Sequence, residues 1–353
     1  MKMPRWAKKW SRKASDVGDA LVDDYTGSHN PYWIRAGAIV VLVYALTILI
    51  LCWYWDKEPS VFNVSENAQA RATAQVVGSV STAALIGIVD TLLTKRGGYL
   101  SNDIAPPGAL MDNIPNWEYG VVIQVRDFNK ALREAFSRSL SQSTEDGDLA
   151  LAESRFNFDH NSWIVPATES EYREGMQYLE NYLKRLGDST QYDAQFYARA
   201  DNLRYWLGTV ETRLGSLSQR LSASVGQRRI NTDLAGEAAG QQSTSAPGEL
   251  VVKTPWLELD DVFYEARGST WALIHLLRAI EIDFDEILRK KNARVSLQQI
   301  IRELEGTQQT LYSPVILNGS GLGLLANHSL VMASYISRAN AAIIDLRELL
   351  AQG

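Results

Sequence analysis

Residues 36–55 have the sequence AGAIVVLVYALTILILCWYW, twenty residues without a charged side chain. Arg35 precedes this stretch and Asp56 follows it. A helix of twenty residues is about 30 Å long, which matches the hydrocarbon core of a bilayer. The stretch therefore predicts a transmembrane helix that separates a short N-terminal segment from a large C-terminal part.

Charge is distributed unevenly on the two sides of this stretch. Residues 1–35 contain seven Lys and Arg and four Asp, a net charge of +3. Residues 56–353 contain the other 28 Lys and Arg together with 37 Asp and Glu, a net charge of −9. Nonspecific nucleic-acid binding needs positive potential, so we expect no nucleic-acid partner for this acidic part.

The segment 1–35 indicates how the span is oriented. Trp6 and Trp10 share one face at helical spacing among basic residues, which predicts an amphipathic helix bound to membrane lipid on the cytoplasmic side. A disordered basic tail is the alternative. The residues expected to set the topology are Lys8, Lys9, Arg12, Lys13 and Arg35. By the positive-inside rule they place the N-terminus in the cytoplasm and residues 56 onward in the periplasm.

The ends of the apolar stretch favour a retained anchor over a cleaved signal peptide. A signal peptide has a shorter apolar region, about 7–15 residues, followed by small residues at the cleavage site. Here the run ends in Trp53, Tyr54 and Trp55, and Trp33 lies before its other end. Such aromatic residues are typical of membrane interfaces. The sequence predicts a single-pass signal anchor in a bacterial inner membrane.

A second uncharged stretch, residues 72–89, leaves two interpretations open. Its sequence, ATAQVVGSVSTAALIGIV, contains Gln75, Ser79 and Ser81 and is more polar than residues 36–55. A buried helix of the domain is the favoured interpretation. A second span would instead return the rest of the chain to the cytoplasm on a two-span hairpin.

Apolar residues at heptad-like spacing predict long helices from residue 170 onward. A first series is Tyr172, Met176, Leu179, Leu183 and Leu186, and a second is Tyr192, Phe196, Ala200, Leu203, Leu207, Val210, Leu214, Leu217 and Leu221. The second begins with two steps of four, which is typical of a stutter. The short Gly-containing turn between them predicts an antiparallel, coiled-coil-like hairpin over 170–225.

The remaining segments complete an all-α prediction: a transmembrane helix followed by a helical bundle. Residues 56–225 form a helical domain, 226–254 a flexible linker, and 255–353 helices that pack on the same bundle. Within these ranges we expect a Pro-rich loop over 100–118 and helices near 119–143, 257–291, 295–308 and 326–350.

The search for catalytic chemistry predicts no catalytic, cofactor-binding or metal-binding residues. Cys52 is the single cysteine and lies within the apolar stretch, which excludes a disulfide framework. No histidine belongs to H-E-x-x-H or follows a Glu by three residues, the spacing of di-iron bundles. His275 lies among Trp271, Leu276 and Leu277 and is expected to be a hydrogen-bonded core residue.

An acidic cluster over 281–286 carries the alternative to this conclusion. It consists of Glu281, Asp283, Asp285 and Glu286. Glu281 and Asp285 are one turn apart, so they could share a cation or an acid–base role. A solvated helix face followed by the basic residues 289–291 is the favoured interpretation. The Gly-rich residues 319–323 are interpreted as a turn, because their spacing does not match a dinucleotide-binding loop.

Residues 90–122, DTLLTKRGGYLSNDIAPPGALMDNIPNWEYGVV, carry a resemblance that extends over nearly the whole chain. With the basic tail, the span and the helical domain, the chain resembles an uncharacterised family of proteobacterial inner-membrane proteins that is known as a domain of unknown function. The resemblance implies placement in the bacterial inner membrane. It implies no activity, ligand or catalytic residue.

Two classes of function follow from these observations. The first is a non-enzymatic envelope protein whose periplasmic helices assemble with themselves or bind a protein partner. The second is an envelope-acting hydrolase or ligand-binding domain that uses Glu281 and Asp285.

Overall fold

A computed structural model describes residues 31–139, 144–188, 190, 193–230, 249–313, 315–320 and 324–352. The chain divides into two compact units, Met1–Trp53 and Tyr54–Gly353. The described part of the first unit is helical and belongs to α2 (Pro31–Trp55). Its apolar side chains are exposed along nearly the whole helix. Tyr32–Trp55 is long and apolar enough to cross a membrane, as the sequence predicts.

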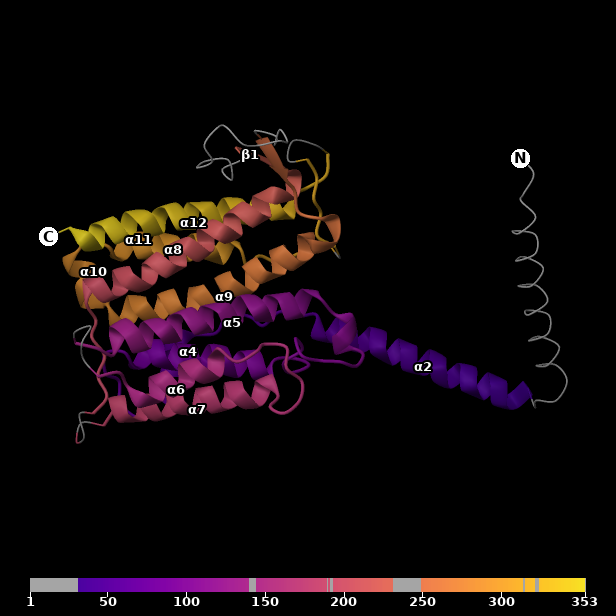
Figure 1. Ribbon diagram of the computed structural model, residues 1–353, viewed down its shortest axis with the longest axis horizontal. Helices are drawn as coiled ribbons and strands as arrows, with labels where there is room; N and C mark the ends of the chain where they lie inside the picture. The colour runs from indigo at the N-terminus through magenta and orange to yellow at the C-terminus, as the bar shows by residue number, and fades with distance from the viewer. Residues whose placement is uncertain are drawn as a thin grey trace, which may run out of the picture. The chain divides into compact units, whose positions relative to one another are not determined.

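The second unit is a bundle of antiparallel helices (Figure 1). Its long helices are α4 (Ser79–Thr94), α5 (Asn113–Ala131), α7 (Thr168–Leu186), α8 (Ala200–Ser222), α9 (Leu259–Asp283) and α12 (His328–Ala351). The shorter ones are α3 (Val64–Arg71), α6 (Gly147–Phe156), α10 (Asp285–Lys290) and α11 (Arg294–Gly306). The described residues also contain two short strands, so the fold is all-α as predicted.

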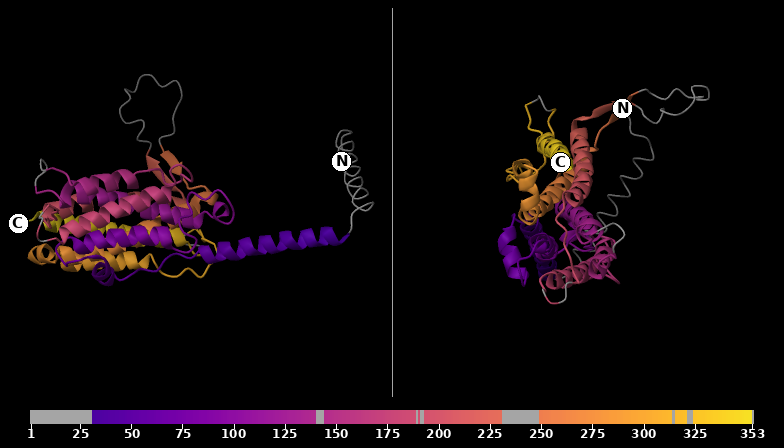
Figure 2. Two further views of the ribbon diagram at one scale, coloured as in Figure 1. Left: turned by 90° about the horizontal axis from the view of Figure 1, so that it is seen from below. Right: turned by 90° about the vertical axis from the view of Figure 1, so that its left-hand side faces the viewer.

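The up-and-down order of the helices places alternate connections at the same end of the bundle. The connections α4–α5, α6–α7, α8–α9 and α11–α12 lie together at one end of the bundle (Figures 1 and 2). Tyr54 and Trp55 contact Arg96 and Gly97 of the α4–α5 connection, so they belong to the same end. We call this end the anchor end and the opposite end the far end. Binding residues of a helical bundle often lie in such loops, because the rigid helices position them.

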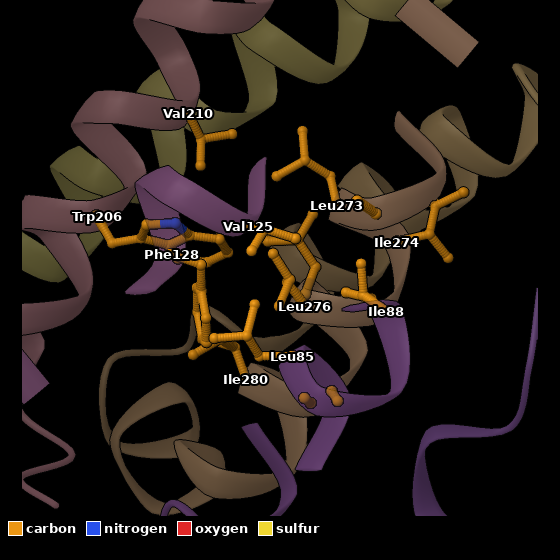
Figure 3. Close-up of a cluster of buried hydrophobic side chains, with 14 of the residues drawn as sticks. Leu85, Ile88, Val125, Phe128, Trp206, Val210, Leu273, Ile274, Leu276 and Ile280 are labelled. Atoms are coloured by element: carbon orange, nitrogen blue, oxygen red, sulfur yellow. The ribbon is translucent and has the colours of Figure 1, made fainter. Parts of the chain in front are cut away.

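The core lies where α4, α5, α8 and α9 meet. Figure 3 shows Phe128 of α5 beside Trp206 of α8, with Leu85 of α4 and Ile280 of α9 close by. All four side chains are fully buried, and the rings of Phe128 and Trp206 meet edge to face at 5.0 Å. Such aromatic contacts add to the large apolar area that these residues bury.

The second apolar stretch forms a buried helix and is not exposed like α2. Helix α4 starts after Gly78, whose φ of +92° interrupts the chain between α3 and α4. Its residues Ala83 to Ile88 are fully buried, and α3, α5, α7 and α9 pack around it. At 16 residues it is shorter than a typical span. This agrees with the favoured interpretation of residues 72–89.

The predicted hairpin over 170–225 is not confirmed. Helix α7 packs against α6 and α4, whereas α8 packs against α12. Residues 193–199 are not helical, and α8 begins only at Ala200. The two steps of four at the start of the second series therefore mark the boundary between this irregular segment and α8, with Phe196 packed against Phe136 and Phe284.

Several boundaries differ from the predicted ones for local reasons. Helix α5 begins at Asn113, six residues inside the predicted loop, since Pro115 in its first turn is compatible with a helix. Phe284 separates α9 from α10, where one helix was predicted. The ends of the predicted linker pair as strands β1 (Gln227–Ile230) and β2 (Glu249–Val252), and residues 231–248 lie outside the described residues.

Candidate functional site

The predicted membrane-interface residues are only partly described by the structure. Trp33, Trp53 and Tyr54 are exposed, Trp55 is half-buried, and Arg35 is an exposed residue of α2. The residues of the basic tail lie outside the described part of the chain; these are Trp6, Trp10, Lys8, Lys9, Arg12 and Lys13. Their predicted roles at the membrane remain predictions.

The last two residues of α2 contact the connection between α4 and α5. The guanidinium of Arg96 lies over the ring of Tyr54, 4.9 Å from its centroid. The indole of Trp55 covers Gly97, where a Cβ would come 2.7 Å from the ring. Gly97 also has φ of +83°, a conformation that favours glycine. Gly97 thus makes room for Trp55 just after the end of α4.

A buried ion pair holds this connection in place. Lys95 and Glu118 form a salt bridge with almost no exposure of either side chain. Glu118 also accepts hydrogen bonds from the backbone N–H of Leu100 at 2.9 Å and of Ser101 at 2.7 Å. Burial raises the pKa of the Glu118 carboxyl, and Lys95 opposes that rise. Because the carboxylate has several donors, it can hold the start of the loop rigidly.

A second buried charge, Arg267 of α9, joins the start of the domain to the end of α11. Its guanidinium binds the carboxylate of Glu58 through two nitrogens, with one N–O distance of 2.6 Å. It also donates to the carbonyl oxygens of Thr307 at 2.9 Å and Gln309 at 3.0 Å. This geometry uses the planar, multi-donor guanidinium in a way that a lysine could not reproduce.

A cavity of about 510 Å³ opens beside Arg267, between α9, α11 and α12. Its wall is largely apolar and aromatic, with Phe263 from α9, Met332 and Tyr335 from α12, and Leu311 and Tyr312 from the α11–α12 connection. A neighbouring hollow of about 610 Å³ shares Arg267 and Leu311 and is lined by residues 56–61. Cavities of this size, mostly apolar with few polar groups, are typical of binding sites.

Comparison with known families identifies the chain. Residues 28–353 match a family described as "Uncharacterized protein conserved in bacteria (DUF2333)". The chain belongs to this family. The match covers α2 and the whole bundle and agrees with the uncharacterised family that the sequence resembles. Neither the curated proteins nor the solved structures compared with the chain gave a match.

The acidic residues of 281–286 are brought together, but each has a protein partner. Glu281 and Asp285 share the guanidinium of Arg294, at 3.4 Å and 3.2 Å, so the cation between them is a side chain of α11. Glu286 pairs with Lys290 at 2.5 Å in the manner expected for a solvated helix face. Among the described residues, no group of three His, Cys, Asp or Glu side chains has an arrangement suited to a metal ion.

Asp283 differs from its neighbours because it is buried. It accepts hydrogen bonds from the backbone N–H of Ser81 at 2.7 Å and from the Ser81 hydroxyl at 2.6 Å. Burial raises the pKa of its carboxyl, and the donors at the start of α4 oppose that rise. Asp283 therefore caps the N-terminus of α4 and has a structural role.

His275 is the predicted hydrogen-bonded core residue. Its Nδ1 donates to the carbonyl oxygen of Trp271 at 2.7 Å, and its Nε2 accepts from the backbone N–H of Phe62 at 3.0 Å. Burial lowers the pKa of His275 to about 4, so the ring is neutral at physiological pH. Its role is to hold the segment before α3 against α9.

The predicted Gly-rich turn is described only in part. Gly319 donates its backbone N–H to the carbonyl oxygen of Ala326 at 3.0 Å, and Asn327 donates to the carbonyl oxygen of Gly319 at 2.6 Å. Residues 321–323 lie outside the described part. The two bonds join described residues on either side of this gap, and the predicted turn stays a prediction.

Three charged residues of the anchor end were not singled out from the sequence: Glu58, Glu118 and Arg267. The sequence does contain a signal for two of these residues, Glu118 and Arg267. Glu118 stands four residues before Val122 on the apolar face of α5, and Arg267 lies in a run of small and apolar residues on α9. A charge on an otherwise apolar helix face implies a buried partner.

Proposed function

We propose that this protein is a non-enzymatic, membrane-anchored binding protein of the bacterial inner membrane. In this proposal α2 is the anchor, the basic N-terminal segment is cytoplasmic, and the helical bundle lies in the periplasm, where it binds a protein partner. The observation that carries the proposal is the apolar cavity beside Arg267, in a domain whose first residues directly follow a helix able to cross the membrane.

Binding is favoured over catalysis by the state of the carboxylates. The acid–base pair that an enzyme of this chain was expected to use, Glu281 and Asp285, is held by Arg294, and Asp285 also pairs with Arg289. General acid–base work needs a group that can reach a substrate with a tuned pKa. The deepest charge beside the cavity, Arg267, is likewise paired with Glu58 and serves to shape the wall.

Partner binding is favoured over self-assembly through the long helices. The heptad residues of α8 from Leu203 to Leu221 are buried, and α12 packs on α8. These helices therefore leave no extended apolar face among the described residues for a second copy. The cavity instead exposes Tyr312, and its wall contains Met332, Tyr335 and Arg267. Aromatic residues, Met and Arg are the types enriched at protein interfaces.

Reporter fusions test the anchor and the compartment. Alkaline phosphatase, which is active only outside the cytoplasm, is fused after residue 60, after residue 98 and at the C-terminus of the chain. We expect activity at all three positions. Activity after residue 60 but not at the two later positions would replace the single-span arrangement with a two-span one, and inactivity at all three would place the bundle in the cytoplasm.

Photo-crosslinking in native membranes tests the partner site. A photoreactive amino acid replaces Tyr312 at the cavity or, as control, Val295 at the far end; both side chains are more than three-quarters exposed. We expect a defined crosslinked protein from position 312 but not from 295. The exposed Thr310, also at the cavity, is then changed to Trp to fill the opening, and the crosslink should be lost. A crosslink that persists with Thr310→Trp would contradict this site.

A further inference from the structure

Three connections at the anchor end present large apolar side chains to solvent. The α4–α5 connection exposes Ile104 and Leu110, and the α6–α7 connection exposes Trp163, Ile164 and Val165. The segment before α9 exposes Trp256 and Leu257. Trp256 is 79% exposed and Val165 is 88% exposed, which leaves both almost without packing in the bundle. Exposed apolar groups that gather at one place mark an interaction surface.

Hydrogen bonds connect these loops with one another and with the residues at the end of α2. The Asn102 side chain donates to the carbonyl oxygen of Ser162 at 2.8 Å, which joins the first two loops. Asn116 donates to Asp261 at 2.7 Å, which joins the start of α5 to the start of α9. The first loop follows directly from Gly97, which Trp55 covers. The apolar residues thus belong to one connected end of the bundle.

The position of Trp55 in the sequence links this end of the bundle to the membrane. Trp55 is the last residue of the apolar stretch, and Asp56 is the first charge after it. If α2 crosses the bilayer, Trp55 lies at the membrane interface, where aromatic residues are enriched. Groups that contact Trp55, and loops bonded to those groups, are then held near the same interface. The apolar loops are continuous with the surface that the anchor already occupies.

The acidic residues near the start of α9 argue against an electrostatic attraction to anionic lipid as the cause of such a contact. Asp112, Glu258 and Asp260 lie near Asp261, and burial together with repulsion from these carboxylates raises the pKa of Asp261. A surface that binds lipid through charge carries clustered Lys and Arg instead. The contact must come from insertion of apolar side chains into the interface.

We propose that the anchor end of the bundle lies on the outer surface of the membrane, with the loops that carry Trp163 to Val165 and Trp256 with Leu257 inserted into the lipid interface. This inference rests on the proposed anchoring by α2. The bundle then contacts the membrane through these two loops in addition to the span.

Spin labels on the full-length protein in nanodiscs of zwitterionic phosphatidylcholine test this inference. Cys52 is the single cysteine, so Cys52→Ser gives a background in which each label site is unique. Labels are attached to Val165→Cys and Leu257→Cys in the loops, to Val295→Cys at the far end, and to Val43→Cys within α2. Collision with oxygen, which concentrates in lipid, is compared with collision with a water-soluble nickel chelate.

We expect the ratio of oxygen to nickel collisions at positions 165 and 257 to be several-fold higher than at 295, and unchanged by high salt. Loop labels that behave like the label at 295 would overturn the inference, and so would loop labels shielded from both reagents, which would indicate a protein contact. The label at 43 separates the two proposals. A lipid signal at 165 and 257 without one at 43 would support the loop contact and contradict the anchor.

Discussion

Trp55 packs its indole over Gly97 so closely that a Cβ at position 97 would come 2.7 Å from the ring. The contact joins the last residue of α2 to the α4–α5 connection. It depends on two properties of glycine at once, the absent side chain and the positive φ of +83°.

Gly97 and Gly98 provide a matched pair for testing this contact. Both have positive φ, but a Cβ at Gly98 would meet its nearest atom, the Leu93 carbonyl oxygen, at 3.9 Å. Gly98→Ala should lower the free energy of unfolding by about 1–2 kcal/mol through backbone strain. Gly97→Ala should lower it by roughly 2–4 kcal/mol, since overpacking against Trp55 is added. Denaturant unfolding in detergent measures the free energy of unfolding of both variants. Equal losses of stability would show that the Trp55 ring moves aside without cost.

The ion pair between Lys95 and Glu118 predicts an asymmetry between single and double variants. Lys95→Met leaves a buried carboxylate without its partner and should destabilise the protein by about 3–5 kcal/mol. Adding Glu118→Gln removes that charge while keeping an oxygen for the Leu100 and Ser101 donors. The double variant should therefore be more stable than Lys95→Met alone. If urea unfolding shows the double variant to be less stable than Lys95→Met, the buried Glu118 carboxylate does not need Lys95 for its stabilisation.

His275 predicts a dependence of stability on pH below neutrality. Its folded pKa of about 4 lies below the ordinary 6.5, so the unfolded chain binds a proton in a range where the folded protein does not. Stability from this group is fully present above pH 6.5 and is lost as pH falls toward 4, by up to about 3 kcal/mol.

The variant His275→Gln serves as the comparison, since glutamine does not titrate. Its unfolding free energy should fall less steeply between pH 6.5 and pH 4 than that of the unmodified protein. Asp283 and the other carboxylates titrate in both proteins, so their contributions cancel in the difference. Equal slopes in the two proteins would contradict a neutral, buried His275.

Helix α12 offers a test of its packing against α8. Leu346 is fully buried, whereas Ile344 on the same helix is 39% exposed. Leu346→Ala should cost about 2–5 kcal/mol of stability because it creates a cavity in a close-packed interface. Ile344→Ala should cost less than about 1 kcal/mol. Thermal unfolding followed by circular dichroism distinguishes the two, and similar losses would mean that α12 is not seated on α8.

Periodicity in the sequence predicted which helix faces are buried but not which helices meet. The heptad residues of α8 from Leu203 to Leu221 lie in the core as expected. Their main partner is α12 and not the neighbouring α7. An apolar stripe indicates that a helix face is buried against another helix, but it does not specify which helix covers that face. The short turn suggested a hairpin, but residues 193–199 form an irregular segment that separates α7 from α8.

The candidate site was predicted less well than the fold because its parts are distant in the chain. Glu58 and Arg267 are 209 residues apart, and no spacing rule links them. His275 was placed in the core because its neighbours along the helix are apolar, a local signal. The cavity has no such signal, since its wall combines three helices and a loop.

The pairing of α8 with α12 has a consequence for how the chain matures. Glu211 and Arg347, which are joined across these helices, are 136 residues apart. During synthesis α8 therefore leaves the ribosome long before the helix that covers it. Until α12 arrives, the stripe from Leu203 to Leu221 remains open to water, to chaperones and to neighbouring chains. The bundle is therefore completed only after α12 has been synthesised.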